Sequence, residues 1–221
     1  KQVDGILFDA TGRYSDVFAD LKSCGMPAIV IGKQIPGLDV TNVSVNNYEG
    51  AHTACSHLVR MGCSKIVFLS SQHDSVTAIG DRFRGYCDAL KENGLPLDEA
   101  FVLQSAMSYQ GATEKTLEMI VSHLGFDAVF ASNDVLAIGC MNTLTDYGFR
   151  VPEDICIIGY DDIPFSMMTR PRLSSVNNNI ETLACLAVKE LLRIIYTRRD
   201  EVRSRCLEPS LVLRETTRAI G

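Results

Sequence analysis

The chain has 221 residues, of which 46% are hydrophobic and 22% are charged. This is the composition of an ordinary globular protein with room for one large or two modest domains. No run of about 18 apolar residues occurs, which excludes a membrane-spanning helix. The net charge of −6 disfavours this chain as the part of a protein that itself binds nucleic acid.

Two kinds of apolar segment alternate along the chain: short continuous runs, and segments with helical spacing. Short apolar runs predict strands at residues 5–8, 28–31, 43–45, 65–69, 101–104, 128–131, 155–159 and 211–213. Helical spacing predicts helices from about residue 15 to 25 and at 50–62, 75–94, 111–124, 133–148 and 182–195. Residues 173–179 have an extended pattern, and the basic residues at 198, 199, 203 and 205 are interleaved with acids, as in a solvated turn. Alternating strands and helices predict a parallel α/β architecture.

Most of the eight cysteines lie within apolar periodic segments. Cys55, Cys87, Cys140, Cys156 and Cys185 have this placement, in which a thiol behaves as a small hydrophobic side chain. Reduced thiols favour a cytoplasmic protein over a disulfide framework. The N-terminal residues lead directly into a predicted strand, with no secretory signal.

One group of histidines and cysteines has the composition of a zinc site. It comprises His52, Cys55, His57 and Cys63. Positions 52 and 57 fall on different faces of the predicted helix, and no paired Cys-x-x-Cys follows. We therefore predict no metal and no cofactor.

The stretch from Phe126 to Asp162 organises the rest of the chain. A buried strand ends at residues 132–134, a helix follows, and a second apolar run ends at residues 160–162. This pattern predicts a βαβ unit with a right-handed crossover, so both polar clusters lie at the carboxyl edge of the sheet. Open α/β sheets bind small ligands at that edge.

Several polar side chains are candidates for ligand binding at this edge. Asn133, Asp134 and Asp161 supply amide and carboxylate groups suited to hydroxyls or ring nitrogens. The alternative is that they cap helices and turns. Arg82 follows the serine-rich end of strand 65–69 and is a candidate reader of ligand oxygens, although an arginine there usually extends into solvent.

Motifs spread along the whole chain closely resemble the effector-binding core of the LacI/GalR family of bacterial transcription regulators. The resemblance rests on VDGI at 3–6, VNNYEG at 45–50, HLVRMG at 57–62, RFRGY at 82–86, SNDVLAIG at 132–139, VPEDI at 151–155, IGYDD at 158–162 and LVLRETT at 211–217. Each motif is weak alone, but their common order is specific. Asn46 and Cys63 depart from the family's usual Asp and His.

The resemblance implies a periplasmic-binding-protein-like fold of two Rossmann-like subdomains with parallel sheets, joined by three crossing segments, with the effector in the cleft between them. By this likeness the N-terminal subdomain comprises residues 1–62 and 174–198, and the C-terminal subdomain comprises residues 63–173 and 199–221. The family pattern implies that the N-terminal subdomain is incomplete and that a helix-turn-helix headpiece is missing.

The resemblance also implies a set of ligand-binding residues. Arg82, Asn133 and Asp161 are the implied readers from the C-terminal subdomain. The other positions that match contributing ones are Asp9, Thr77, Glu49 and Asn178. Arginine, amide and carboxylate groups suit a polyol, so we expect a sugar effector.

The function implied is that of an effector-sensing domain that controls binding of operator DNA through the headpiece. The family likeness further implies a homodimer, with helices 50–62 and 75–94 as candidates for the shared face. The alternative is a secreted sugar-binding protein of a transport system. An enzyme is disfavoured because no dinucleotide, phosphate-loop or Gly-x-Ser-x-Gly signature occurs.

Overall fold

A computed structural model of the chain describes residues 3–9, 20–21, 23–34, 39–71, 77–197 and 201–218. The chain forms two compact units. Unit 1 comprises Lys1–Asn46, Val76–Ala78 and Asn179–Glu208, and unit 2 comprises Asn47–Ser75, Ile79–Asn178 and Pro209–Gly221. The helix predicted from about residue 15 lies mostly outside the described residues.

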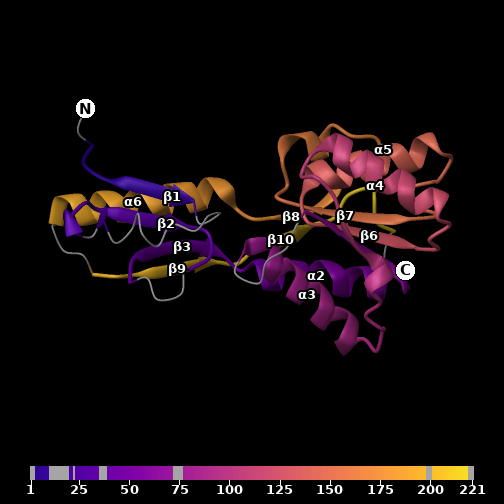
Figure 1. The fold of residues 1–221 in the computed structure, drawn as a ribbon, viewed down its shortest axis with the longest axis horizontal. Coiled ribbons are helices and arrows are strands. Elements are labelled where there is room, and N and C mark those ends of the chain that lie inside the picture. The colour runs from indigo at the N-terminus through magenta and orange to yellow at the C-terminus, as the bar shows by residue number, and fades with distance from the viewer. Residues whose placement is uncertain are drawn as a thin grey trace. The chain divides into compact units, whose positions relative to one another are not determined.

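Unit 1 contains a parallel sheet of four strands in the order β1-β2-β3-β9, packed against one long helix (Figure 1). The strands are β1 (Ile6–Asp9), β2 (Ala28–Ile31), β3 (Thr41–Val45) and β9 (Ser204–Leu207). The helix is α6 (Ile180–Thr197). Its buried face meets Ile29 and Val43 of the sheet through the side chains of Leu183, Ala187 and Ile194.

The turn predicted around Arg203 and Arg205 is wrong, because this segment forms strand β9 beside β3. Three of its four side chains are exposed. An edge strand can carry charged side chains because its place in the sheet depends on backbone pairing, and such charges also discourage further strands from adding.

Unit 2 contains a sheet of six strands in the order β10-β8-β7-β6-β4-β5. The strands are β4 (Ile66–Ser70), β5 (Val102–Gln104), β6 (Ala128–Ala131), β7 (Cys156–Tyr160), β8 (Ser174–Asn177) and β10 (Ser210–Val212). Every neighbouring pair is parallel except β10 and β8. The predicted parallel α/β fold is therefore confirmed.

Helices cover both faces of this sheet (Figure 1). One face packs against α2 (Asn47–Arg60) and α3 (Ala78–Glu92), and the other against α4 (Tyr109–Val121) and α5 (Asp134–Asp146). Two short 3₁₀ helices, η1 (Glu99–Phe101) and η2 (Pro164–Met167), complete the unit. Strands β4, β6 and β7 are buried at every position, which explains their continuous apolar runs.

The unit boundaries differ from those expected. Apart from the short segment Val76–Ala78 of unit 1, the chain passes from one unit to the other at Asn46/Asn47, Asn178/Asn179 and Glu208/Pro209, whereas the expected transitions were near residues 62, 173 and 198. The main difference is helix α2, which belongs to unit 2. Gly50 explains this packing, because a Cβ atom there would lie 2.5 Å from Tyr160 Oη and 3.0 Å from Val176 Cγ1. Helical periodicity in the sequence predicts which face of α2 is buried, but it does not predict which of the two sheets that face packs against.

The cysteine placements follow the predicted apolar stripes with one exception. Cys55, Cys140 and Cys156 are buried and Cys87 is partly buried, but Cys185 is exposed. The prediction for Cys185 is wrong because it lies off the stripe of α6 that faces the sheet. None of the helices in the described ranges is long and apolar enough to cross a membrane.

Candidate ligand-binding site

The carboxyl edge of the sheet of unit 2 gathers a group of polar side chains. Parallel strands β4, β6, β7 and β8 all end at this edge. Asp161 directly follows β7, and Asn178 directly follows β8. The βαβ geometry expected from the stretch 126–162 is therefore present, and this edge is the usual position of ligand sites in open α/β sheets.

Arg82 of α3 is the centre of this group. It is only 9% exposed, and its guanidinium contacts three elements. Nε donates to Asn47 Oδ1 over 2.8 Å, Nη1 donates to the carbonyl oxygen of Ser132, and Nη2 donates to Asp161 Oδ1 over 3.2 Å. The guanidinium carbon lies 3.6 Å from the centroid of the Tyr160 ring. A buried arginine with these partners has a fixed position.

Asp161 carries the accessible charge of the group. Its side chain is 31% exposed, and its Oδ1 accepts from Asn178 Nδ2 over 3.0 Å as well as from Arg82. Its second oxygen, Oδ2, has no hydrogen-bond partner among the described residues. Asn178 Oδ1 is buried and likewise lacks a partner within the described part of the chain. Two acceptors are therefore available to a ligand that donates hydrogen bonds.

Asn133 and Asp134 have different surroundings from this group. Asn133 is the N-cap of α5, with Oδ1 accepting from the backbone nitrogen of Leu136 over 2.8 Å. Its Nδ2 has no partner among the residues that the structure describes, so it can still donate to a ligand. The expected ligand role of Asn133 stays a prediction, limited to its amide nitrogen.

Asp134 is a structural residue, as the capping alternative proposes. It is buried, and its carboxylate accepts hydrogen bonds from Ile163 N over 2.8 Å, Ser166 Oγ over 2.6 Å and Ser175 Oγ over 2.6 Å. Burial raises the pKa of Asp134 to about 6. Its contacts anchor the loop that follows β7, so Asp134 is not available to a ligand.

The remaining predicted residues are Asp9, Thr77 and Glu49. Asp9 is exposed at the end of β1, and both Asp9 and Thr77 belong to unit 1. Glu49 is exposed in the first turn of α2 and accepts from Thr53 Oγ1 over 3.4 Å. The ligand roles expected for these three residues stay predictions.

Two partners of Arg82 were missed by sequence reasoning. Asn47 begins α2, and Tyr160 ends β7. An arginine beside an apolar helical stripe is a signal that it has buried partners, but no spacing rule gives their identity. Among the described residues, no group of three or more His, Cys, Asp or Glu side chains is arranged to hold a metal ion.

Comparison with known proteins identifies the family. A model described as a periplasmic binding protein-like domain matches residues 55–217. The chain belongs to this family. Periplasmic binding protein-like domains with known structures include the regulator CelR in complex with cellobiose, with a TM-score of 0.89 and 28% identity. That alignment covers 97% of this chain and 66% of CelR.

Two further relatives of this periplasmic binding protein-like chain are regulators. A LacI family regulator from Enterococcus faecium with bound ribose has a TM-score of 0.90 and 28% identity, over 97% of this chain and 80% of that one. The regulator GalR of Escherichia coli K12 is 33% identical over 201 residues, which are 90% of this chain and 58% of GalR. The resemblance to the LacI/GalR effector-binding core is confirmed. The chain spans less than two thirds of the length of the curated relatives it matches.

Proposed function

We propose that this chain is the effector-binding core of a bacterial transcription regulator and that it binds a sugar at the Arg82–Asp161–Asn178 group. The observation that carries the proposal is the pair of available acceptors beside a fixed arginine: Asp161 Oδ2 and the buried Asn178 Oδ1. A buried acceptor without a partner costs free energy that a ligand donor recovers. The bound ribose and cellobiose of the solved relatives support a sugar.

The chemistry of a sugar matches these groups. Vicinal hydroxyls donate to Asp161 Oδ2 and Asn178 Oδ1, while a hydroxyl or ring oxygen accepts from Asn133 Nδ2. The carboxylate of Asp161 forms stronger hydrogen bonds than a neutral amide oxygen does, and its ion pair with Arg82 fixes its position. The hydroxyl pattern of the sugar then decides its affinity, because an unmatched buried acceptor rejects analogues that lack a donor.

The regulator is preferred to a secreted transport protein and to an enzyme. The relatives named above are transcriptional regulators. All eight cysteines are free thiols, which suits a cytoplasmic protein. Arg82 and Asp161 are hydrogen-bonded to one another and to amides, not to a nucleophile, so the group is suited to binding.

Operator DNA is the second partner in this proposal. The relatives are longer than this chain, and we assign DNA binding to a helix-turn-helix headpiece outside it. The net charge of −6 supports that division, because a DNA-contacting surface is basic. A sugar can change operator affinity only if it binds one conformation of the regulator better than another.

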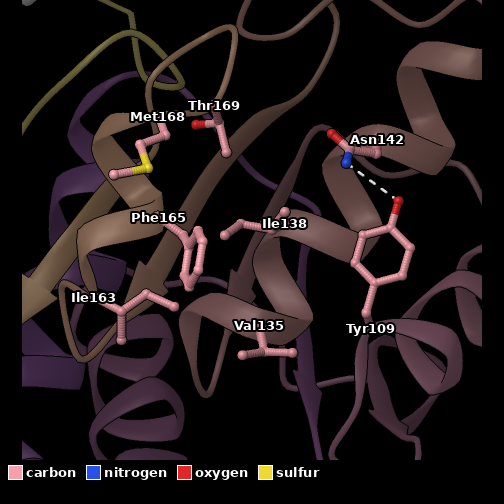
Figure 2. A pocket seen from close by; sticks show the side chains of 8 residues that line it. All are labelled: Tyr109, Val135, Ile138, Asn142, Ile163, Phe165, Met168 and Thr169. Atoms are coloured by element: carbon pink, nitrogen blue, oxygen red, sulfur yellow. Dashed lines mark hydrogen bonds between the residues drawn. The ribbon is translucent and has the colours of Figure 1, made fainter.

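The proposed homodimer uses an apolar face of unit 2. A groove of about 450 Å³ lies between α4, α5 and the loop containing η2, lined by Tyr109, Val135, Ile138, Asn142, Ile163, Phe165, Met168 and Thr169. Figure 2 shows these side chains. Phe165 is 64% exposed and Met168 is 68% exposed. Such a cluster is unusual on a monomer and suits a self-complementary interface with a second copy. We prefer this face to helices α2 and α3.

Titration calorimetry with a panel of ligands tests the proposed function. The panel is D-ribose, D-galactose and cellobiose, with adenosine and hypoxanthine as ring-nitrogen ligands and potassium sulfate as an anion control. We expect saturable binding of at least one sugar with one site per chain. Binding of purines alone, or of no ligand in the panel, would contradict the proposal.

A further inference from the structure

The backbone that presents Asp161 has an unusual conformation. Asp161 has a φ of 98° and Asp162 a φ of 51°. Positive φ is costly for residues with a side chain and persists only where the surroundings impose it. The direction of the Asp161 carboxylate depends on this conformation, because a change at either φ would swing it away from Arg82 and Asn178.

Both the side chain and the backbone amide of Asp162 are held by hydrogen bonds. Asn177 Nδ2 donates to Oδ2 over 3.0 Å, and the Asp162 amide donates to Ser175 Oγ over 3.1 Å. Its other oxygen, Oδ1, accepts from Arg214 Nη2 over 2.6 Å. The side chain of Asp162 is 10% exposed, so it is a poor candidate for direct contact with a ligand.

Arg214 follows β10 and connects Asp162 to strand β8. Its side chain is 12% exposed, and Nη1 donates to the Leu173 carbonyl oxygen over 2.7 Å. Its own backbone nitrogen donates to Ser174 Oγ over 2.8 Å. The guanidinium therefore links Asp162, which lies just after β7, to Leu173, which lies just before β8. Removing it would leave the Asp162 charge largely buried without its cation.

We propose that Arg214 is a positioning residue for the ligand site: through its ion pair with Asp162 it holds Asp161 in the conformation that binds ligand. This inference rests on the proposed function of Asp161. The physical link is direct, because Asp161 and Asp162 are adjacent and both have positive φ. In this proposal Asp162 holds the backbone and Asp161 contacts the ligand. Loss of the ion pair lets the two φ angles relax, and the Asp161 carboxylate then leaves Arg82 and Asn178.

The competing explanation is that Arg214 only anchors the C-terminal segment. Arg218 provides the matched control, because it lies four residues further along and donates to the carbonyl oxygens of Pro152 and Glu153. Arg218→Gln removes an anchor of that segment and leaves the Asp162 ion pair intact. Arg214→Gln removes the ion pair. Arg214→Lys retains the charge but loses the fork that reaches both Asp162 and Leu173.

The test combines nuclear magnetic resonance of the free chain with sugar titration. In ¹⁵N-labelled protein we expect Arg214→Gln to shift or broaden the Arg82 Nε–H signal and the Asn178 side-chain amide signals. Arg214→Lys should restore them in part, and Arg218→Gln should leave them unchanged. Affinity for the sugar of the panel should fall about tenfold or more in Arg214→Gln, as when other orienting partners of a binding group are removed.

Each outcome separates this inference from the proposed function. Unchanged Arg82 and Asn178 signals in folded Arg214→Gln would overturn it, as would equal changes in Arg218→Gln. If Arg214→Gln does not fold, Asp162→Asn is used with the same signals, because the amide keeps the shape of the side chain and removes its charge. If the parent chain binds no sugar, the proposed function fails, while the signals still decide whether Arg214 positions Asp161.

Discussion

At the scale of single residues, Asp134 and Asp161 lie at the same edge of the sheet but differ in burial and in hydrogen bonding. Asp134 is buried, accepts three hydrogen bonds and anchors a loop, whereas Asp161 keeps one carboxylate oxygen without a partner among the described residues. Both follow buried strands and both looked like ligand residues in the sequence. Their burial and their partners separate them, and neither property can be read from residue type.

Asp134 predicts a pH dependence of stability. Its pKa is about 6 in the folded chain and near 3.9 when unfolded, so the folded state binds the extra proton between these values. The contribution of Asp134 to stability therefore rises as the pH falls from 7 towards 4. We expect Asp134→Asn to lose this contribution, so that its destabilisation relative to the parent is larger at pH 4.5 than at pH 7 by about 1–3 kcal/mol.

Urea unfolding of the parent and of Asp134→Asn at the two pH values measures this difference. Asp146→Asn is the control, because Asp146 is exposed at the end of α5. A destabilisation by Asp134→Asn that is the same at both pH values would show that the carboxyl is not protonated in that range.

At the scale of elements, sequence periodicity predicted where strands and helices begin and end. It did not predict which elements pack against or pair with one another. The strands and helices of the βαβ unit 126–162 lie within a residue or two of their expected bounds, because apolar runs and glycine stops are local signals. The unit to which α2 belongs and the pairing of β9 with β3 are non-local facts. Two polar residues of the site, Arg82 and Asp161, were predicted from strand ends, but Asn47 was not, since it reaches Arg82 from another helix.

The packing of α2 within unit 2 gives a second prediction. A side chain at Gly50 would meet Tyr160 Oη at 2.5 Å and Pro209 Cγ at 3.0 Å. We expect Gly50→Ala to destabilise the chain by about 1–3 kcal/mol, because a well-packed interface cannot make room for another methyl group. Gly125→Ala is the matched control, since its nearest neighbour would be Lys65 Nζ at 3.9 Å.

Thermal unfolding of the two variants measures the effect. Equal stability of Gly50→Ala and Gly125→Ala would mean that α2 is not held as closely as the packing of Gly50 requires.

At the scale of the whole molecule, this chain is one component of a proposed dimeric regulator. The ligand group and the apolar groove both use the loop that follows β7, at Asp161 and at Phe165 respectively. Asp134 anchors the same loop through Ile163 and Ser166. The candidate ligand site and the proposed partner surface therefore share this loop within unit 2.

The apolar face predicts how assembly responds to substitution. We expect the parent chain to sediment as a dimer at micromolar concentration and the Phe165→Ser, Met168→Ser double variant to sediment as a monomer, because two exposed apolar anchors are removed. Tyr147→Ser, at an exposed position after α5, should remain a dimer. A monomeric parent, or a double variant that still pairs, would exclude this face as the dimer interface.

The most direct test of the proposed ligand site compares the sugar affinity of three chains by calorimetry: the parent, Asp161→Ala and Asp146→Ala. Removing one charged partner from a buried hydrogen-bonded contact costs about 2–5 kcal/mol, which corresponds to a loss of affinity of roughly thirtyfold or more. We expect that loss in Asp161→Ala, with parental affinity in Asp146→Ala. Parental affinity in folded Asp161→Ala would contradict the site, whichever sugar binds.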